Sequence, residues 1–225
     1  ICFKLFNNNK EINEWKKNID IDFEQYVDLN KLNDYDIGSY FRIAEKYDKS
    51  HILFLNTYTR INANNWLRIY ANHFEKNTVI SATASFASRS SQFFNFFYSD
   101  QPKIKQIVRG LKCLKDFKLF PNPHLRSNGF FINSEDLLKL NFNRLKFIDK
   151  YFCHLFESGR DSLTCQLLKK KFKLKIVNSD NKSFEIPNWK DSKTYSLNLQ
   201  EKLIFKDNRT DDYDKSIGEL KAKLK

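Results

Sequence analysis

The chain has 225 residues, and a composition of 41% hydrophobic and 16% aromatic residues allows it to bury a sizeable core, which excludes disorder for its body. Lys and Arg total 39 against 27 Asp and Glu, and the net charge of +12 favours an anionic partner: nucleic acid, a membrane surface or a phosphorylated small molecule. The sequence contains no G-x-G-x-x-G or Walker-type phosphate loop, and no apolar run approaches the roughly 18 residues of a membrane-spanning helix.

Three further features of the composition concern the origin of the chain. It contains no methionine and opens with a strand-like segment, residues 1–6, so we expect it to be a piece of a longer protein. Asn, Lys, Ile and Phe are abundant and have A/T-rich codons, so part of the positive charge is attributed to coding bias. The four cysteines form no C-x-x-C pair, which predicts reduced thiols and a cytoplasmic protein.

The first half of the chain alternates strands with helices. Strands are predicted at residues 1–6, 23–29, 51–55 and 79–82. The inward faces of the first two intervening helices contain Ile12, Trp15 and Ile19, then Ile37, Tyr40, Phe41 and Ala44. A third helix, capped by Asn64-Asn65, runs through Trp66, Leu67, Tyr70 and Phe74. Segment 51–55 is continuous and apolar, as is typical of a central parallel strand. This rhythm predicts an α/β fold with a mostly parallel sheet covered on both faces.

The second half of the chain is less regular. The predicted helices are a basic amphipathic helix through residues 103–115, a short helix from Ser134, a helix after Asp161, and a C-terminal helix at 212–225. The helix after Asp161 is expected to turn Leu163, Leu167 and Leu168 inward. Strands are predicted at 128–132 and 173–177, and a rigid Pro-containing loop at 120–124. Because neither a repeat nor a linker is found, we expect a single domain over residues 1–225.

Polar residues that follow the predicted strands are the first candidates for a functional site. In an open parallel sheet, ligands bind beyond the carboxyl ends of the strands. Asp28, Asp36 and the segment 56–60, Asn-Thr-Tyr-Thr-Arg, occupy such positions. A loop that only caps the following helix is the alternative interpretation of segment 56–60.

Several motifs, in order along the chain, resemble the GT-A glycosyltransferase family. Asp36-Ile37-Gly38-Ser39-Tyr40, the segment 51–61 and Asn65-Trp66-Leu67 resemble the family's helix, the apolar strand that ends in Asp-x-Asp, and the Trp-Leu helix after it. Residues 126–132 and 156–173 resemble the strand beside the acceptor site and the acidic motif with its helix. Phe-Leu-Asn-x-x-x-Arg, Phe-Pro-Asn-Pro-His-x-Arg-x-Asn, Phe-Glu-Ser-Gly-Arg and Asp-Asn-Arg-Thr together resemble a subgroup of bacterial surface-polysaccharide glycosyltransferases.

This resemblance covers residues 1–213 and implies a three-layer α/β/α domain that transfers a sugar from a nucleotide-sugar donor to a glycan or lipid-linked glycan acceptor. The donor-binding residues that it implies are Lys4, Asp28, Asp36, Asn56, Tyr58 and Arg60, and the acceptor-binding residues are His124, Arg126 and Asn128. A lipid-linked acceptor would give a reason for peripheral contact with the inner face of a membrane, through the aromatic segment 93–98 and the basic helix after it.

Two carboxylates are candidates for the catalytic base. In inverting members of the family, a carboxylate near the start of the later helix takes the proton from the acceptor hydroxyl, and Glu157 or Asp161 matches that position. The aromatic segment 151–156 is expected to desolvate Glu157 and raise its pKa. For Asp161 the alternative is a helix N-cap, and for Glu157 it is a surface ion pair.

The family's metal-binding motif is degenerate in this chain. Asn56-Thr57-Tyr58 stands in place of Asp-x-Asp, so both carboxylates that would hold Mn²⁺ or Mg²⁺ on the donor diphosphate are missing. We therefore predict no metal ligands and no certain cofactor. Either cations such as Arg60 or Lys4 neutralise the leaving diphosphate, or the domain is inactive.

Two alternatives remain beside the glycosyltransferase hypothesis. A nucleic-acid-binding module would explain the charge and the aromatic residues, although the basic residues are spread along the chain. The densest basic run, residues 169–175, is interpreted as a solvated face, so nucleic acid is not the preferred partner. A catalytically inactive GT-A-like scaffold would explain the loss of the metal ligands.

Overall fold

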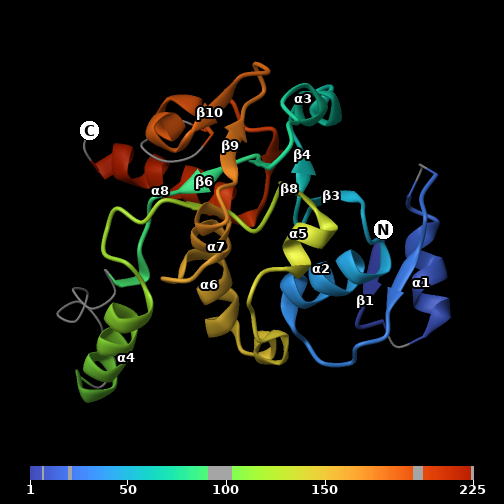
Figure 1. The fold of residues 1–225 in the computed structure, drawn as a ribbon, viewed down its shortest axis with the longest axis horizontal. Helices are drawn as coiled ribbons and strands as arrows, with labels where there is room; N and C mark the ends of the chain where they lie inside the picture. Colours follow the sequence, from blue (N-terminus) through green and yellow to red (C-terminus); the bar gives the residue numbers. More distant parts are fainter. Residues whose placement is uncertain (7, 20–21, 91–102, 195–199, 224–225) are drawn as a thin grey trace.

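The computed structural model describes the whole chain except residues 7, 20–21, 91–102, 195–199 and 224–225, and it has a mixed α/β fold (Figure 1). The helices are α1 (Asn9–Lys16), α2 (Tyr35–Lys46), α3 (Trp66–Asn72), α4 (Lys103–Asp116), α5 (Ser134–Leu138), α6 (Lys150–Ser158), α7 (Leu163–Lys169) and α8 (Asn208–Lys223), with 3-10 turns η2 (Arg144–Ile148) and η3 (Ile186–Ser192). The strands are β1 (Cys2–Lys4), β2 (Tyr26–Asp28), β3 (His51–Phe54), β4 (Arg60–Ile61), β5 (Thr78–Ser81), β6 (Ala84–Ser85), β7 (His124–Leu125), β8 (Phe130–Asn133), β9 (Lys173–Val177), β10 (Ser183–Glu185) and β11 (Phe205–Lys206).

The main sheet has five strands in the order β10-β9-β5-β8-β3. β5 and β9 run parallel, whereas the pairs β10–β9, β5–β8 and β8–β3 are antiparallel. β1 and β2 form a separate parallel pair, and β4–β11 and β6–β7 are short antiparallel pairs. The expectation of a mostly parallel central sheet is therefore wrong, because the main sheet is mixed and mostly antiparallel.

The apolar segment 51–55 forms strand β3, but β3 lies at the edge of the main sheet and pairs only with β8 among the described strands. Both of its faces are nevertheless covered. The Phe54 ring lies 4.6 Å from that of Tyr40 in α2, and Leu53 and Leu55 pack into the core on the opposite face. A continuous apolar run therefore indicates that both faces of the strand are buried. It does not indicate that the strand pairs with a neighbouring strand on each edge. The prediction that segment 51–55 is a central parallel strand is wrong.

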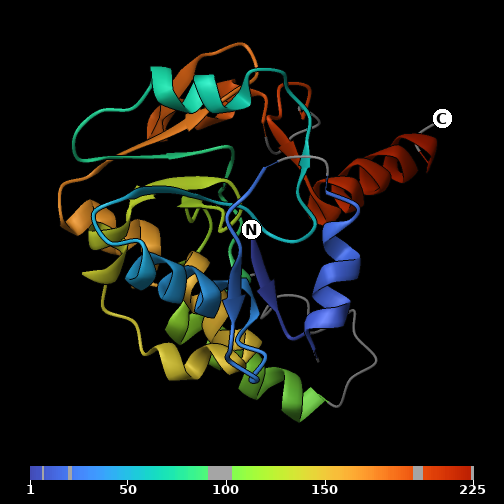
Figure 2. The same cartoon turned by 90° about the vertical axis from the view of Figure 1, so that its right-hand side faces the viewer.

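The fully buried strand of the main sheet is β5, whose neighbouring residues point to opposite cores. Val79 packs in the larger core with side chains of α2, α6 and α7, and Ile80 packs in the smaller core with α3 and β11. Figures 1 and 2 show α2, α6 and α7 on one side of the sheet and α3 on the other.

Helical periodicity predicted the elements better than their orientation. The α2 residues Ile37, Tyr40, Phe41 and Ala44 are buried as expected. Trp15, however, is 61% exposed and Leu168 is 42% exposed, so these two residues do not face the core. The aromatic segment 93–98 lies outside the described residues. Within the described ranges, no helix has the length and apolar content to cross a bilayer.

Candidate functional site

Glu157, in the last turn of α6, is held by the segment that joins β7 to β8. Its Oε1 accepts hydrogen bonds from the Ser127 backbone N–H at 2.8 Å, from the Ser127 hydroxyl at 3.1 Å and from Arg126 Nε at 3.1 Å. The Glu157 and Arg126 side chains are 18% and 19% exposed, so this ion pair has only limited contact with solvent. No residue in the described part of the chain donates a hydrogen bond to Oε2, which leaves this oxygen able to accept one from a ligand.

The surroundings of Glu157 correct the expectation that its pKa is raised. Burial alone would raise the pKa, but the charge of Arg126, the nearby His124 and the hydrogen bonds from Ser127 together lower it from 4.5 to about 2. The aromatic residues of α6 do desolvate the carboxyl group, yet its charge and hydrogen-bond partners outweigh that effect. Glu157 is therefore ionised at neutral pH.

His124 lies beside this carboxylate in β7 and is 5% exposed. Its Nδ1 donates to the Asn122 carbonyl oxygen at 2.7 Å, and the Asn122 side chain donates to the Ser158 carbonyl oxygen at 2.7 Å. Burial lowers the pKa of His124 below its usual value of 6.5, so the imidazole is mainly neutral. His124 and Arg126 thus both lie near Glu157.

A second polar group lies directly next to the first, because Asn128 follows Ser127. The Asn128 Oδ1 accepts hydrogen bonds from the Asn56 N–H at 3.1 Å and from the Thr59 hydroxyl at 2.8 Å. The Asn128 Nδ2 donates to Asp207 Oδ2 at 3.0 Å. Asn128 therefore joins the loop after β3 to the segment that precedes α8.

The Asn56-Thr57-Tyr58 segment does not fit a divalent metal ion. The Asn56 Oδ1, the nearest substitute for a carboxylate ligand, accepts hydrogen bonds from the Tyr58 N–H at 3.0 Å and from the Thr59 hydroxyl at 3.1 Å. The amide is thus used to close its own turn. Nor do the described residues contain a group of three or more His, Cys, Asp or Glu side chains that could hold a metal.

Two of the predicted donor-binding residues lie on the outer side of this loop. Tyr58 is 64% exposed. Arg60, in β4, binds Asp211 of α8 through its Nη2, at 2.6 Å from each carboxylate oxygen. Asp207 caps α8 by accepting hydrogen bonds from the Arg209 and Thr210 N–H groups, each at 3.0 Å. Residues 207–210 therefore form the start of a helix that packs against the Asn56 loop.

Three cationic or titratable groups on or close to α6, Arg89, His154 and Arg209, are not among the residues that the sequence predicted for the site. Arg89 is partly buried, and its Nε is buried without a hydrogen-bond partner among the described residues. Its charge, together with those of Lys150 and Arg209, acts on His154, whose pKa is lowered from 6.5 to about 4, mainly by burial. Glu157 acts on the same histidine in the opposite direction. Arg89 comes from a segment without a recognisable motif, and the Asp-Asn-Arg-Thr motif that contains Arg209 carries no sign of its position near α6, so only the fold could reveal both.

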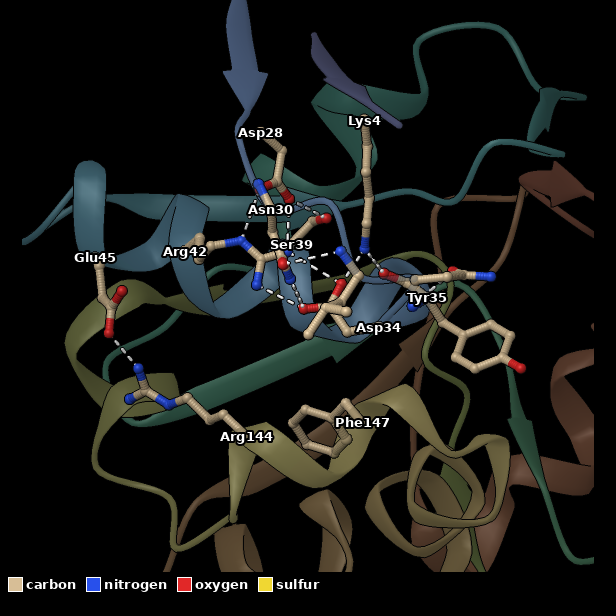
Figure 3. A network of polar contacts seen from close by, with 12 residues as sticks. Lys4, Asp28, Asn30, Asp34, Tyr35, Ser39, Arg42, Glu45, Arg144 and Phe147 are labelled. Atoms are coloured by element: carbon tan, nitrogen blue, oxygen red, sulfur yellow. Dashed lines mark hydrogen bonds and ion pairs between the residues drawn. The ribbon is translucent and has the colours of Figure 1, made fainter. Parts of the chain in front are cut away.

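Lys4 and Asp28, also predicted to bind the donor, belong instead to a buried ion network (Figure 3). Asp28 accepts hydrogen bonds from Arg42 Nε at 2.9 Å, Arg42 Nη2 at 2.6 Å and the Ser39 hydroxyl at 2.8 Å. Arg42 also binds Asp34, which in turn is paired with Lys4. This network ties β1, β2 and the loop before α2 to that helix. Its members already have partners within the protein, so donor binding by Lys4 and Asp28 requires these contacts to break.

Asp36 is the exception in this region, because its side chain is exposed in the first turn of α2. Partial desolvation raises the pKa of Asp36, while Lys4 acts to lower it. Its charge and that of Glu157 both act on Tyr40, whose pKa burial raises well above 10. The Tyr40 hydroxyl is buried and has no hydrogen-bond partner among the described residues.

Asp161 is not brought into contact with this site. It is 55% exposed, binds Lys169 at 2.6 Å and lines a different hollow, on the side of α6 next to η2. Its alternative interpretation as an N-cap is also wrong, because Ser162 caps α7 through a hydrogen bond from the Cys165 N–H. The structure therefore separates the two candidate carboxylates.

Comparisons with protein-family models, with curated proteins and with solved structures find no match to this chain. The function of the site is accordingly argued from its own geometry.

Proposed function

We propose that this chain is a glycosyltransferase that moves a sugar from a nucleotide-sugar donor to a glycan or lipid-linked glycan acceptor. The observation that carries the proposal is the Glu157 carboxylate. It is held ionised at the edge of solvent, with one oxygen not bonded by any described residue, and Arg126 Nε lies 3.1 Å from its other oxygen. The charges of Arg89 and Arg209 act on His154, one turn earlier in the same helix. A carboxylate that binds hydroxyl groups next to cations that bind phosphate suits a ligand that contains both.

The side chains around Glu157 support a phosphorylated sugar in particular. Asn128, Asn56 and Thr59 provide amide and hydroxyl groups of the kind that bind sugar hydroxyls, although part of their hydrogen-bonding capacity is used within the protein. Arginine pairs well with phosphate oxygens because its guanidinium can donate two parallel hydrogen bonds.

In an inverting transfer, the acceptor hydroxyl donates to Glu157 Oε2 and attacks the anomeric carbon of the donor. The new carbon–oxygen bond forms as the bond to the nucleoside diphosphate breaks. The electron pair leaves on the phosphate, where arginine side chains stabilise the charge, and the hydroxyl proton moves to Glu157. No step is assigned to a metal, because the Asn56-Thr57-Tyr58 turn does not fit one.

Thermal unfolding in the presence of UDP-, GDP- and dTDP-sugars tests the donor site. A donor at 100 times its Kd should stabilise the fold by about 2.7 kcal/mol. Arg209→Gln should remove most of this stabilisation, because it removes a cation that is proposed to bind the donor phosphate. Arg209 is exposed, so the substitution leaves no buried group unpaired and the fold itself should be unaffected. Arg68→Gln, an exposed arginine on α3, is the matched control and should respond like the unmodified chain. Absence of stabilisation by every nucleotide sugar would contradict the proposal.

One feature supports an inactive scaffold as the second candidate. Both carboxylates of the Asp-x-Asp motif are replaced, and the substitute Asn56 is engaged in its own turn. An inactive scaffold that kept the donor site would still be stabilised by a nucleotide sugar but would transfer no sugar from it. Binding and turnover must therefore be measured separately.

A further inference from the structure

Helix α4 carries an apolar stripe that faces away from the protein. Ile104, Ile107, Val108 and Leu111 are spaced as i, i+3, i+4 and i+7 and therefore share one face, and they are 77%, 42%, 62% and 55% exposed. The helix packs on the body through a different face, where Cys113 is 1% exposed and Phe117, just beyond its end, is fully buried. The stripe is thus not the packing face of α4. Figures 1 and 2 show the helix at one end of the molecule, away from α3.

The charges on α4 are almost all of one sign. Lys105, Arg109, Lys112 and Lys115 lie along the helix, and its only acidic residue is the terminal Asp116. Asp116 already accepts a hydrogen bond from the Tyr151 hydroxyl at 2.6 Å. An exposed apolar stripe flanked by Lys and Arg is the pattern of a helix that lies in the interface of an anionic bilayer.

A basic pocket lies beside the stripe, between α4, α6 and Arg89. Its volume is about 380 Å³, and its lining includes Arg89, Lys105, Arg109 and Lys112, together with Ile104 and Val108 of the stripe. Arg89 brings a buried Nε without a hydrogen-bond partner among the described residues. Lys112 is held in position with its Nζ 3.9 Å from the centre of the Tyr151 ring. The pocket therefore combines phosphate-binding cations with an apolar rim.

We propose that α4 docks this protein on an anionic phospholipid bilayer, with the apolar stripe in the interface and a lipid phosphate in the basic pocket. The charge of the helix selects an anionic surface, and the stripe selects a lipid over a free phosphate or a nucleic acid. This inference shares Arg89 with the proposed donor site but has a different readout, because vesicle binding is measured without any sugar transfer.

Flotation of the protein with lipid vesicles tests the inference. Vesicles of phosphatidylcholine with about one third phosphatidylglycerol should carry the protein upward, and pure phosphatidylcholine should not. Lys105→Ala combined with Arg109→Ala should weaken partition roughly 30-fold, which corresponds to about 1 kcal/mol for each cation. Val108→Ser combined with Leu111→Ser should weaken it by about tenfold or more, because both side chains would otherwise leave water.

The control replaces two exposed leucines outside α4. Leu67 in α3 is 58% exposed and Leu145 in η2 is 85% exposed, so Leu67→Ser with Leu145→Ser removes comparable apolar surface. This variant should float like the unmodified chain, and all variants should keep the same thermal unfolding midpoint. Equal recovery with both kinds of vesicle would overturn the inference, as would no loss for the stripe variant. If the protein binds single-stranded oligonucleotide, and the stripe variant binds it as strongly as the unmodified chain, the basic face would be assigned to nucleic acid instead.

Discussion

Glu157 is a weaker base than its position in the sequence suggested. A general base works best when its pKa lies near the working pH, whereas that of Glu157 is lowered to about 2. Such a carboxylate accepts a proton only after the attacking hydroxyl has begun to bond to carbon, which makes the hydroxyl far more acidic. In the proposed transfer, its first role would be to orient the acceptor hydroxyl through a hydrogen bond, and its second would be to receive the proton late in the reaction.

Glu157→Gln should lower turnover roughly 10²–10⁴-fold, the usual scale for the loss of a general base. The amide still occupies the same space and can accept hydrogen bonds from Ser127, so donor-induced stabilisation should remain nearly unchanged. Steady-state sugar transfer and thermal unfolding with donor measure the two effects. Asp161→Asn is the matched control, since Asp161 is exposed in the turn before α7 and does not contact Glu157, and it should retain turnover. A larger loss of turnover for Asp161→Asn than for Glu157→Gln would show that the assignment of the base to Glu157 is wrong.

The sequence could indicate Glu157 as a candidate but not its pKa. The local aromatic residues of α6 suggested desolvation and a raised pKa. The opposing groups, Arg126 and Ser127, are 31 and 30 residues away along the chain. They meet Glu157 only because the β7–β8 connection crosses the end of α6, and that contact has no signal in the sequence.

At the scale of the element, α2 is the helix that the ion network fixes to the rest of the fold. Arg42 lies between Asp28 and Asp34, whose side chains are 0% and 6% exposed. Burial of these charges is costly, and only the dense set of hydrogen bonds offsets that cost. The apolar periodicity of α2 predicted its buried face, but not the pairing of Lys4 with Asp34, 30 positions apart, or of Asp28 with Arg42, 14 positions apart. The sequence therefore indicated a donor-binding role for Lys4 and Asp28 instead.

Gly38→Ala should destabilise the fold by about 2–4 kcal/mol, between the costs of overpacking and of breaking a buried ion pair. A Cβ at residue 38 would lie 1.9 Å from Asp34 Oδ2, the oxygen that binds Arg42 and Asn30 (Figure 3). The Asp34 side chain would have to leave the network. Chemical denaturation measures the loss. Lys46→Ala, at an exposed position of the same helix, should change stability by less than about 0.5 kcal/mol, and an equally small effect of Gly38→Ala would show that the network has room to adjust.

At the scale of the molecule, strand content was predicted more reliably than strand order. Segments 51–55 and 79–82 form strands, as their apolar runs predicted, and segment 173–177 forms one, as its alternating pattern predicted. The observed strand order differs from the predicted one because hydrophobicity indicates only which strand faces are buried. Both β3 and β5 have buried faces, so this signal does not distinguish them. Which strand takes neighbours on both edges depends on pairing between distant segments. β8 inserts antiparallel between β3 and β5, and this pairing moves β3 to the edge of the main sheet.

Acid should destabilise the molecule in two overlapping stages. The pKa of His154 is lowered to about 4, so only the unfolded chain takes up this proton as the pH falls from 6.5, and stability present above 6.5 is progressively lost. The pKa of Glu157 is lowered from 4.5 to about 2, and the corresponding loss of about 3 kcal/mol develops between these two values. Asp36, whose pKa is raised, acts in the opposite direction.

Denaturant unfolding between neutral pH and about pH 3 measures this dependence. His154→Asn should flatten the first stage, and Glu157→Gln should flatten the second while lowering stability at neutral pH, because the Arg126 partner is lost. The two variants thus assign each stage to one group, even though the net charge of +12 adds a general repulsion that grows as carboxylates are protonated. A second stage of unchanged size in Glu157→Gln would mean that the acid sensitivity comes from other carboxylates, such as those of the Arg42 network.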